Sequence, residues 1–139
     1  MLKTISHQKV LYGMTDRMGV MYYGHYPLLY ELGRTDWIRQ FGIPYKTMED
    51  DWNIALPVLE LNVRYLRPAT YDELIQVTTD LKELPSKIII FEHELFNENQ
   101  EVINRATVKL GFFDMKNKKL VFCPDYLMNK IQDNFESDQ

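Results

Sequence analysis

The sequence has little that would direct the protein out of the cytoplasm. Its single cysteine, Cys123, cannot form a disulfide within the chain, so a reducing compartment is the simpler expectation. Residues 1–8, MLKTISHQ, lack the apolar core of a signal peptide, and no apolar run approaches the length of a membrane span. We therefore expect a cytoplasmic protein without membrane insertion.

The sequence also lacks a surplus of positive charge. Its 16 Lys and Arg residues are outnumbered by 20 Asp and Glu residues, which gives a net charge of −4. A chain of this charge has no overall attraction for nucleic acid or for an anionic membrane. The three histidines show no metal-ligand spacing, and there is no glycine-rich phosphate loop. We expect neither a nucleic-acid partner nor a metal site.

Internal repeats and low-complexity segments are also missing. The chain has 139 residues, of which 45% are hydrophobic and 13% aromatic, so it is long and apolar enough to bury a core. This length is too short for two independent cores. We expect a single domain over residues 1–139.

One long helix is predicted over residues 27–41. Pro27 suits the first helical position, where its missing N–H costs nothing, and Gly42 suits the left-handed residue that follows a helix. Apolar residues occur on more than one face of this helix, so we expect it to be covered on most sides. Gly33 inside the helix indicates a close neighbour at that turn.

The remaining chain is dominated by period-two alternation, which is typical of strands. The predicted strands are residues 3–12, 59–65, 74–84, 88–96, 102–113 and 120–123, with a small helix after Pro124. The strand at 59–65 alternates as a half-buried strand does, and residues 45–52 read as a polar connection with at most one helical turn. These elements predict an α+β fold, with a curved antiparallel sheet or a dimer covering the long helix.

The segment that precedes the long helix carries the most distinctive chemistry. Asp16 lies in an irregular stretch that contains Gly19, and a short tether joins it to the helix start at Pro27. A carboxylate can attack a carbonyl carbon or activate water, while free N–H groups at a helix start can polarise the carbonyl oxygen. This pairing suits acyl transfer. Alternatively, Asp16 only caps the turn around Gly19.

Residues 16–26, DRMGVMYYGHY, together with Tyr30, Glu31 and Arg34, resemble the signature of hotdog-fold acyl-CoA thioesterases of the 4-hydroxybenzoyl-CoA thioesterase type. The similarity continues through VRYLRPA at 63–69 and YDEL at 71–74, and through Ser86 and Ala106 on later strands. The order of elements agrees from residue 5 to residue 131.

The resemblance implies a curved antiparallel sheet wrapped around one central helix, the hotdog fold. It also implies a homodimer or a dimer of dimers with sites at the dimer interface, and an acyl-CoA substrate whose coenzyme A is the only cofactor. Asp16 would be the nucleophile or general base, and the backbone N–H groups of Tyr23 and Gly24 would bind the thioester oxygen. The chain departs from the family at His25, where many members have Asn or Ser, and at Tyr23, where one branch has His.

Two residues near the helix start have open roles. His25 would hold the acyl group or assist proton transfer, or else it is a packing residue. Glu31 would orient the loop or a water molecule, or else it pairs with Arg34 three residues on.

Three residues further along the chain are candidates for binding coenzyme A. Ser86, Lys87 and Arg105 would contact its phosphates or its pantetheine arm, since phosphate groups favour Arg and Lys donors. The alternative is that they are solvated residues at strand ends.

The leading hypothesis is hydrolysis of an acyl-CoA thioester to a free acid and coenzyme A. A non-catalytic acyl-CoA-binding or interaction module on the same fold is the main alternative, because a fold does not by itself define a function. A hotdog dehydratase would pair His25 with Glu31, but the glycine and proline pattern of that group is missing.

Overall fold

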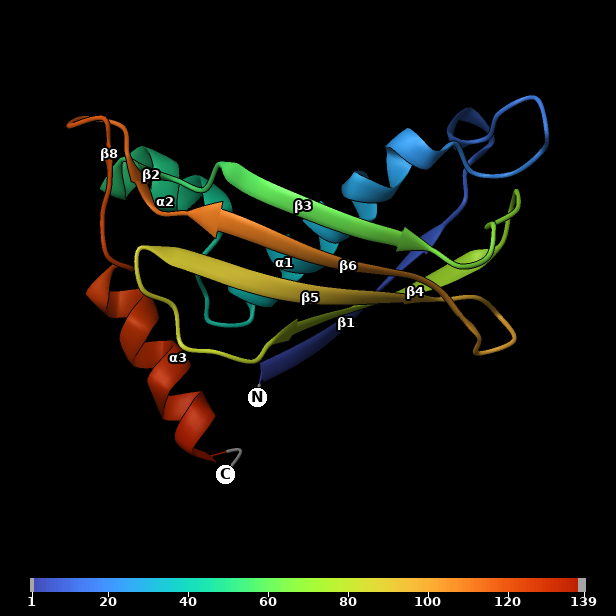
Figure 1. Cartoon of the computed structure of the whole chain (residues 1–139). Helices are drawn as coiled ribbons and strands as arrows, with labels where there is room; N and C mark the ends of the chain where they lie inside the picture. Colours follow the sequence, from blue (N-terminus) through green and yellow to red (C-terminus); the bar gives the residue numbers. More distant parts are fainter. Residues whose placement is uncertain (1, 138–139) are drawn as a thin grey trace.

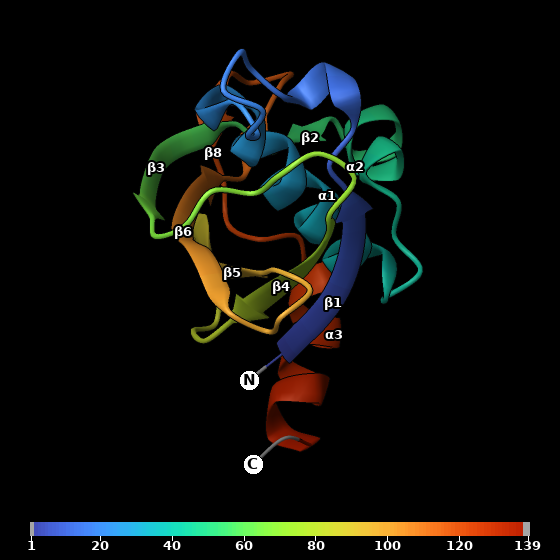
Figure 2. The ribbon, with the colours of Figure 1, turned by 90° about the vertical axis from the view of Figure 1, so that its right-hand side faces the viewer.

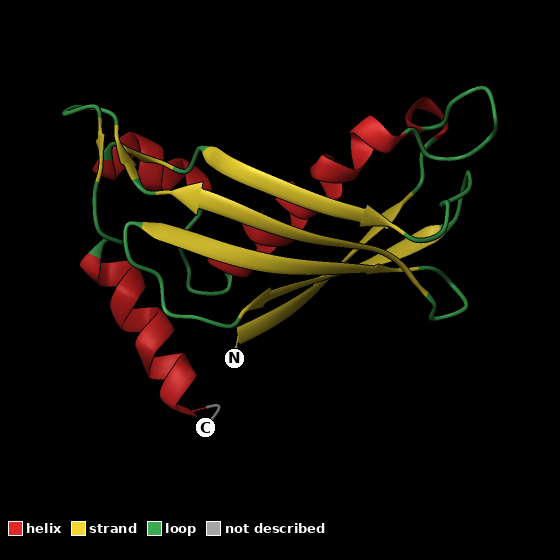
Figure 3. Cartoon of the chain, viewed as in Figure 1, coloured by secondary structure: helices red, strands yellow, loops and turns green. Residues whose placement is uncertain are grey.

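The computed structural model describes residues 2–137 and is built on a five-stranded antiparallel sheet (Figures 1 and 3). The strand order is β1-β4-β5-β6-β3. The bounds of these strands are β1 Leu2–Lys9, β3 Val58–Tyr65, β4 Leu74–Leu81, β5 Ile88–Phe96 and β6 Val102–Gly111. Each predicted long strand is therefore present, and those predicted at 3–12, 74–84 and 102–113 end two to three residues earlier than predicted.

The sheet curls around the long helix α1, Tyr26–Arg39, as the view along the sheet shows (Figure 2). The buried positions of α1 recur every three or four residues and so form one face: Tyr26, Leu29, Tyr30, Gly33, Arg34, Trp37 and Ile38. This confirms the predicted curved antiparallel sheet around one helix. The expectation that α1 is covered on most sides is confirmed, since within the helix only Leu28, Glu31 and Arg39 are exposed and they mark the one open side.

α1 approaches the sheet closely at Gly33. A Cβ atom at this position would overlap the Thr79 hydroxyl of β4 and would lie 3.2 Å from Val77 Cγ1. Only glycine lets the two backbones come this near without displacing a neighbour. The close neighbour predicted for this turn is therefore confirmed.

The inner faces of the central strands follow the predicted alternation. On β4, the residues Ile75, Val77, Thr79 and Leu81 are fully buried. The edge strand β3 behaves differently, since Leu61 and Tyr65, which pair with the buried Val108 and Asn104 of β6, are 41% and 49% exposed. The prediction of a half-buried strand is wrong for most of β3, because α1 lies against β1, β4 and β5 and leaves the β3 edge uncovered.

Smaller elements cover the end of the sheet at which the chain leaves β6. These are helix α2, Tyr45–Trp52, helix α3, Asp125–Ser137, and a small sheet of β2, Ile54–Ala55, β7, Phe113–Asp114, and β8, Lys119–Leu120. The predicted polar connection at 45–52 is thus a full helix, because Met48 is buried against the core. The strand predicted at 120–123 is shorter and begins at Lys119.

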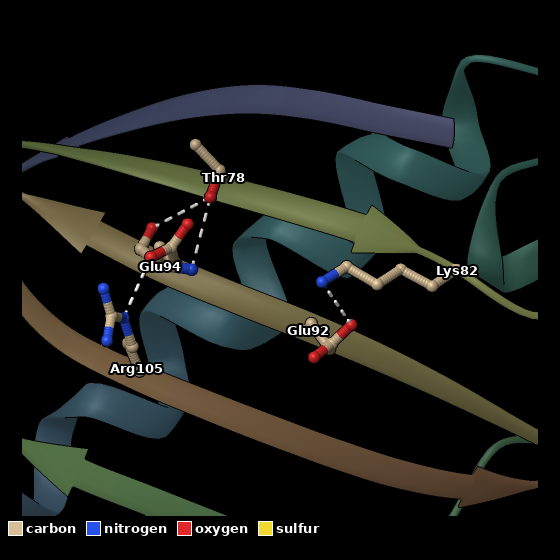
Figure 4. Close-up of polar contacts among 5 residues, drawn as sticks. All are labelled: Thr78, Lys82, Glu92, Glu94 and Arg105. Atoms are coloured by element: carbon tan, nitrogen blue, oxygen red, sulfur yellow. Dashed lines mark hydrogen bonds and ion pairs between the residues drawn. The ribbon is translucent and has the colours of Figure 1, made fainter. Parts of the chain in front are cut away.

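The outer face of the sheet is polar and carries ion pairs between neighbouring strands (Figure 4). Lys82 lies 3.1 Å from Glu92, and Arg105 lies 3.0 Å from Glu94, whose backbone also bonds to the Thr78 hydroxyl. Exposed pairs of this kind stabilise a fold by at most about 1 kcal/mol each. Across residues 2–137, no helix is long and apolar enough to cross a membrane.

Candidate active site

The loop that carries Asp16 is a tight turn with left-handed backbone at Gly19, where φ is +81°. The backbone N–H of Asp16 donates to the carbonyl of Val20 at 2.9 Å, and the N–H of Gly19 donates back to the carbonyl of Asp16 at 3.1 Å. Asp16 Oδ1 accepts the N–H of Met18 at 2.8 Å. Asp16 therefore does cap its own turn, and within residues 2–137 no hydrogen bond engages its second oxygen, Oδ2.

Two short 3₁₀ turns flank this loop. η1, Tyr12–Met14, precedes it, and η2, Tyr23–His25, follows it and leads directly into α1. The amide N–H of Tyr22 donates to the carbonyl of Met14 at 2.8 Å, which closes the loop at its base. Pro27 occupies the first turn of α1, as predicted. The N–H groups of Tyr23 and Gly24 belong to the start of this helical segment, where helical acceptors are missing.

Asp16 and this helix start line one pocket of about 330 Å³. The pocket is mostly apolar and aromatic, with one carboxylate and one guanidinium in its lining: Asp16, Met18, Val20, Met21, Tyr23, Tyr26, Tyr65, Leu66, Arg67 and Pro68. Two segments that are distant in sequence, 16–26 and 65–68, thus meet around the Asp16 carboxylate. A carboxylate and the start of a helical segment, at Tyr23 and Tyr26, therefore line one cavity.

Sequence reasoning did not assign Tyr26, Tyr65 or Arg67 to this site. Strand parity places Tyr65 on the same face as Leu61 and Val63, but parity gives no information on which loop lies opposite. The resemblance had included Tyr65 and Arg67 within its second motif, and this was the one signal for them. Their place in the pocket depends on how the end of β3 meets the Asp16 loop.

Two tyrosines of α1, Tyr26 in the pocket lining and Tyr30 after it in the sequence, have pKa values above the ordinary value. Burial raises the pKa of Tyr26, and burial also raises the pKa of Tyr30, one turn further along α1. The Tyr30 hydroxyl donates to Oδ1 of Asn104 inside the core. At neutral pH the hydroxyl groups of Tyr26 and Tyr30 are therefore uncharged.

Gly24, His25 and Glu31 lie outside the lining of this pocket. The His25 ring is edge-on to Tyr22, with centroids 5.7 Å apart, as expected for a packing residue. Glu31 is exposed on α1, and its charge reaches Arg34. Burial lowers the pKa of Arg34, while Tyr45 and Glu31 act in the opposite direction. The roles assigned to His25 and Glu31 stay predictions.

The three residues predicted to bind coenzyme A are not brought to the Asp16 pocket within one chain. Ser86 and Lys87 lie beside the segment that precedes α3, where the N–H of Cys123 donates to the Ser86 carbonyl and Lys87 Nζ lies 5.7 Å from the Phe122 ring centroid. Arg105 is on the outer face of the sheet (Figure 4). Their predicted role remains untested.

A second hollow, of about 460 Å³, lies on that outer face. Its lining includes Lys82, Glu92, Glu94 and Arg105, which pair with one another across the strands. Of these two hollows, the smaller Asp16 pocket is the one that joins a carboxylate to a helix start. Among residues 2–137, no group of three His, Cys, Asp or Glu side chains is arranged to hold a metal ion.

Comparison with known families agrees with this geometry. Residues 10–131, which include the whole Asp16 pocket, match the thioesterase-like superfamily. The chain belongs to this superfamily. The predicted resemblance, the hotdog fold and the enzyme class, a thioester hydrolase, are thereby confirmed.

Individual thioesterases of this superfamily are similar over most of their length. The acyl-CoA thioesterase YbgC of Haemophilus influenzae is 31% identical over 116 residues, covering 84% of this chain and 85% of that protein. A DHNA-CoA thioesterase from Staphylococcus aureus has a TM-score of 0.89 at 28% identity, covering 100% of this chain and 97% of that one. A 4-hydroxybenzoyl-CoA thioesterase mutant in complex with 4-hydroxybenzoyl-CoA shares the fold, with a TM-score of 0.83 at 17% identity over 93% of this chain and 98% of that one.

Proposed function

We propose that this protein hydrolyses an acyl-CoA thioester to the free acid and coenzyme A, with Asp16 as the reacting carboxylate. The observation that carries the proposal is the shared pocket, in which Asp16 and the start of α1 face the same cavity. The names of the relatives support an acyl-CoA substrate.

Asp16 can act in either of two ways. As a nucleophile, its oxygen attacks the thioester carbon, the C–S bond breaks to release the coenzyme A thiolate, and water then hydrolyses the mixed anhydride. As a general base, it takes a proton from a water molecule that attacks the same carbon. The turn bond from Met18 holds Oδ1, so Oδ2 is the oxygen available for either role.

The negative charge that develops on the thioester oxygen would be met by the N–H groups of Tyr23 and Gly24. The first N–H groups of a helical segment have no carbonyl partners within it, and they carry the positive end of the helix dipole. Donors fixed in this way stabilise an oxyanion without rearranging during the reaction. The proposed mechanism needs no cofactor beyond the coenzyme A of the substrate.

The acyl group would lie against the tyrosine and methionine side chains of the pocket, chiefly Tyr26, Tyr65 and Met21. Tyr26 and Met21 are buried, while Tyr65 is half exposed at the rim. Apolar and aromatic walls of this kind suit an acyl group, which carries no charge.

We further propose a homodimer formed through the β3 edge. β3 has an unpaired edge and exposes Leu59, Leu61 and Tyr65 in the single chain. An exposed apolar edge strand is a template for pairing with a second copy. Antiparallel pairing about a two-fold axis would bring the Ser86 end of one protomer toward the Asp16 end of the other. Ser86, Lys87 and Arg105 would then reach coenzyme A across the interface. Light scattering tests this, and a stable monomer would contradict it.

The alternatives have less support. A dehydratase would need His25 and Glu31 to act on one substrate, but the His25 ring packs edge-on against Tyr22 and Glu31 is exposed on α1. A pure binding module would not require a carboxylate whose second oxygen is unengaged. Cytoplasmic action remains our expectation, since acyl-CoA thioesters are made and used inside cells.

The test is release of free coenzyme A from a panel of short-chain, long-chain and aromatic acyl-CoAs, with wild type and Asp16→Asn side by side. We expect turnover by wild type and a loss of several orders of magnitude in the variant. The panel also identifies the acyl group.

Asp16→Asn keeps the Oδ1 acceptor for the Met18 N–H, so the turn and the fold should persist. A circular dichroism melting curve like that of wild type verifies this. Wild-type turnover in a folded Asp16→Asn protein would refute the assigned role. No turnover by wild type on any substrate of the panel would favour the binding module.

A further inference from the structure

We infer that Tyr65 is a positioning residue of the catalytic centre, whose hydroxyl orients the Tyr23–Gly24 peptide and with it the Gly24 N–H. The inference rests on the proposed function, in which this N–H is one of the oxyanion donors. Tyr65 comes from the end of β3, 42 residues along the chain from Tyr23.

The Tyr23 carbonyl lacks the donor that an α-helix would give it. In an α-helix, the carbonyl of a residue accepts the N–H of the fourth residue after it. For Tyr23 this residue is Pro27, which has no N–H. Within the 3₁₀ turn η2 the Tyr23 carbonyl has the Tyr26 N–H, three residues on, as its helical partner. Pro27 removes the second, α-helical partner, so one lone pair of this oxygen stays open to a donor from outside the helix.

The Tyr65 hydroxyl supplies this donor. It donates to the carbonyl oxygen of Tyr23 at 3.3 Å. The Tyr65 ring is held in place by edge-on contacts, with its centroid 5.2 Å from that of Tyr26 and 6.5 Å from that of Tyr23. The register pairs Tyr65 on β3 with Asn104 on β6. Asn104 Oδ1 accepts the hydroxyl of Tyr30, so a hydrogen bond also joins β6 to α1.

Fixing the carbonyl also fixes the N–H of the same peptide. In a planar trans peptide the C=O and N–H bonds point in opposite directions, so a bond on the Tyr23 oxygen sets the direction of the Gly24 N–H. A hydrogen bond to a carbonyl also polarises its peptide and strengthens the N–H as a donor. The benefit is largest when the acceptor is an oxyanion, so it acts on the transition state more than on the bound substrate.

Tyr65→Phe tests the inference because it removes one oxygen and keeps the ring that lines the pocket. We expect kcat to fall about fivefold, the size of one ordinary hydrogen bond, with KM within about twofold of wild type. A role confined to the pocket wall would instead leave kcat and KM both unchanged.

Tyr71→Phe is the matched control. Tyr71 is also half exposed and also edge-on to another tyrosine, Tyr12, with centroids 5.7 Å apart, but it lies outside the pocket lining. Its removal of one hydroxyl should change neither kcat nor KM.

A second measurement does not depend on turnover. In ¹⁵N-labelled, substrate-free protein, the amide resonance of Gly24 should move in Tyr65→Phe and stay in place in Tyr71→Phe, because only the first change alters the Tyr23–Gly24 peptide. The inference is overturned if Tyr65→Phe keeps the wild-type kcat, or if the Gly24 resonance does not move. If wild type releases no coenzyme A, the proposed function fails, and the Gly24 resonance still decides whether Tyr65 orients this peptide.

Discussion

Two turns that each begin with an aspartate, residues 16–20 and 114–118, lie at opposite ends of the sheet (Figure 1). They share one local design. In the Asp16 turn, residues 16–20, Oδ1 accepts the N–H of the second residue after it at 2.8 Å. In the Asp114 turn, residues 114–118, Oδ1 accepts the N–H of Lys116 in the same way at 2.9 Å. Each turn also contains a residue with positive φ, Gly19 at +81° and Lys118 at +56°.

The two carboxylates differ in whether one of their oxygens remains without a hydrogen bond. Asp114 accepts further bonds from the backbone N–H and the side-chain amide of Asn117, which reach Oδ1 and Oδ2. Asp16 keeps Oδ2 unengaged and faces a cavity beside a helix start. The comparison teaches that the turn motif itself carries no chemistry. The reactive character assigned to Asp16 comes from what the fold places around it.

The largest expected difference is in turnover. Asp16→Asn should lower kcat by several orders of magnitude, whereas Asp114→Asn should leave kcat unchanged, because both variants keep the Oδ1 acceptor and only one removes the reacting charge. Coenzyme A release by the two purified variants checks this. Equal losses in both would mean that the turns act through stability alone.

The next effect concerns the core between the two ends. His93 on β5 is buried, stacks on Tyr30 with centroids 5.1 Å apart, and has Nδ1 3.1 Å from the Thr79 hydroxyl. Burial, with a smaller contribution from the charge of Arg34, lowers the pKa of His93 to about 3. The native protein therefore keeps His93 neutral at a pH where the unfolded chain binds a proton.

Because the unfolded state binds that proton, stability should fall as the pH drops below about 6.5, by up to about 1.4 kcal/mol per pH unit. The loss should continue toward the native pKa of about 3. Urea unfolding at pH 7 and pH 5 measures it, and His93→Gln should show a smaller difference between the two pH values. An equal difference in that variant would assign the acid sensitivity to other groups. Because α1 packs over His93 between the two ends of the sheet, we expect acid to unfold both ends in a single transition.

A smaller expected effect is the difference in stability between backbone variants of the Asp16 turn and of the Asp114 turn. Gly19→Ala should destabilise the protein by about 1 kcal/mol, because alanine is strained in the left-handed region, and it should lower turnover by disturbing the Asp16 turn. Lys118→Gly should change stability by less than about 0.5 kcal/mol, since the relief of strain and the added chain entropy oppose each other. Urea unfolding of both variants checks the pair. A Gly19→Ala protein as stable and active as wild type would show that the loop tolerates rearrangement.

The smallest effect is the pH response of the Asp114 turn. Hydrogen bonds from Asn117, with a further bond from Lys116, lower the pKa of Asp114. A carboxyl group with a lowered native pKa stabilises the fold above its unfolded pKa of about 3.9, and this contribution is lost as the pH falls through the native value. Asp114→Asn should remove a small part of the acid sensitivity below pH 4 while leaving the stability profile between pH 5 and 7 unchanged. A change confined to pH 5–7 would contradict the assignment.

Much of the fold could be predicted from the sequence because its signals are local. Alternation with a period of two identified the long strands and the buried face of β4, and Pro27 marked the start of α1. Gly33 indicated a close neighbour, and Thr79 fills that role. The exposure of β3 could not be predicted in this way, because parity defines a strand's two faces but does not reveal whether another element covers them.

For the candidate site too, some features could be predicted from the sequence and others could not. The Asp16 turn, the short tether to α1 and the missing N–H at Pro27 could be read from the sequence alone, since each depends on residues a few positions apart. Only the tertiary structure decided that Tyr65 and Arg67 join this pocket and that Ser86, Lys87 and Arg105 of the same chain do not. These placements depend on the curvature of the sheet and on the register of β3 against β6, which are products of packing across the whole core and have no signature in any single stretch of sequence.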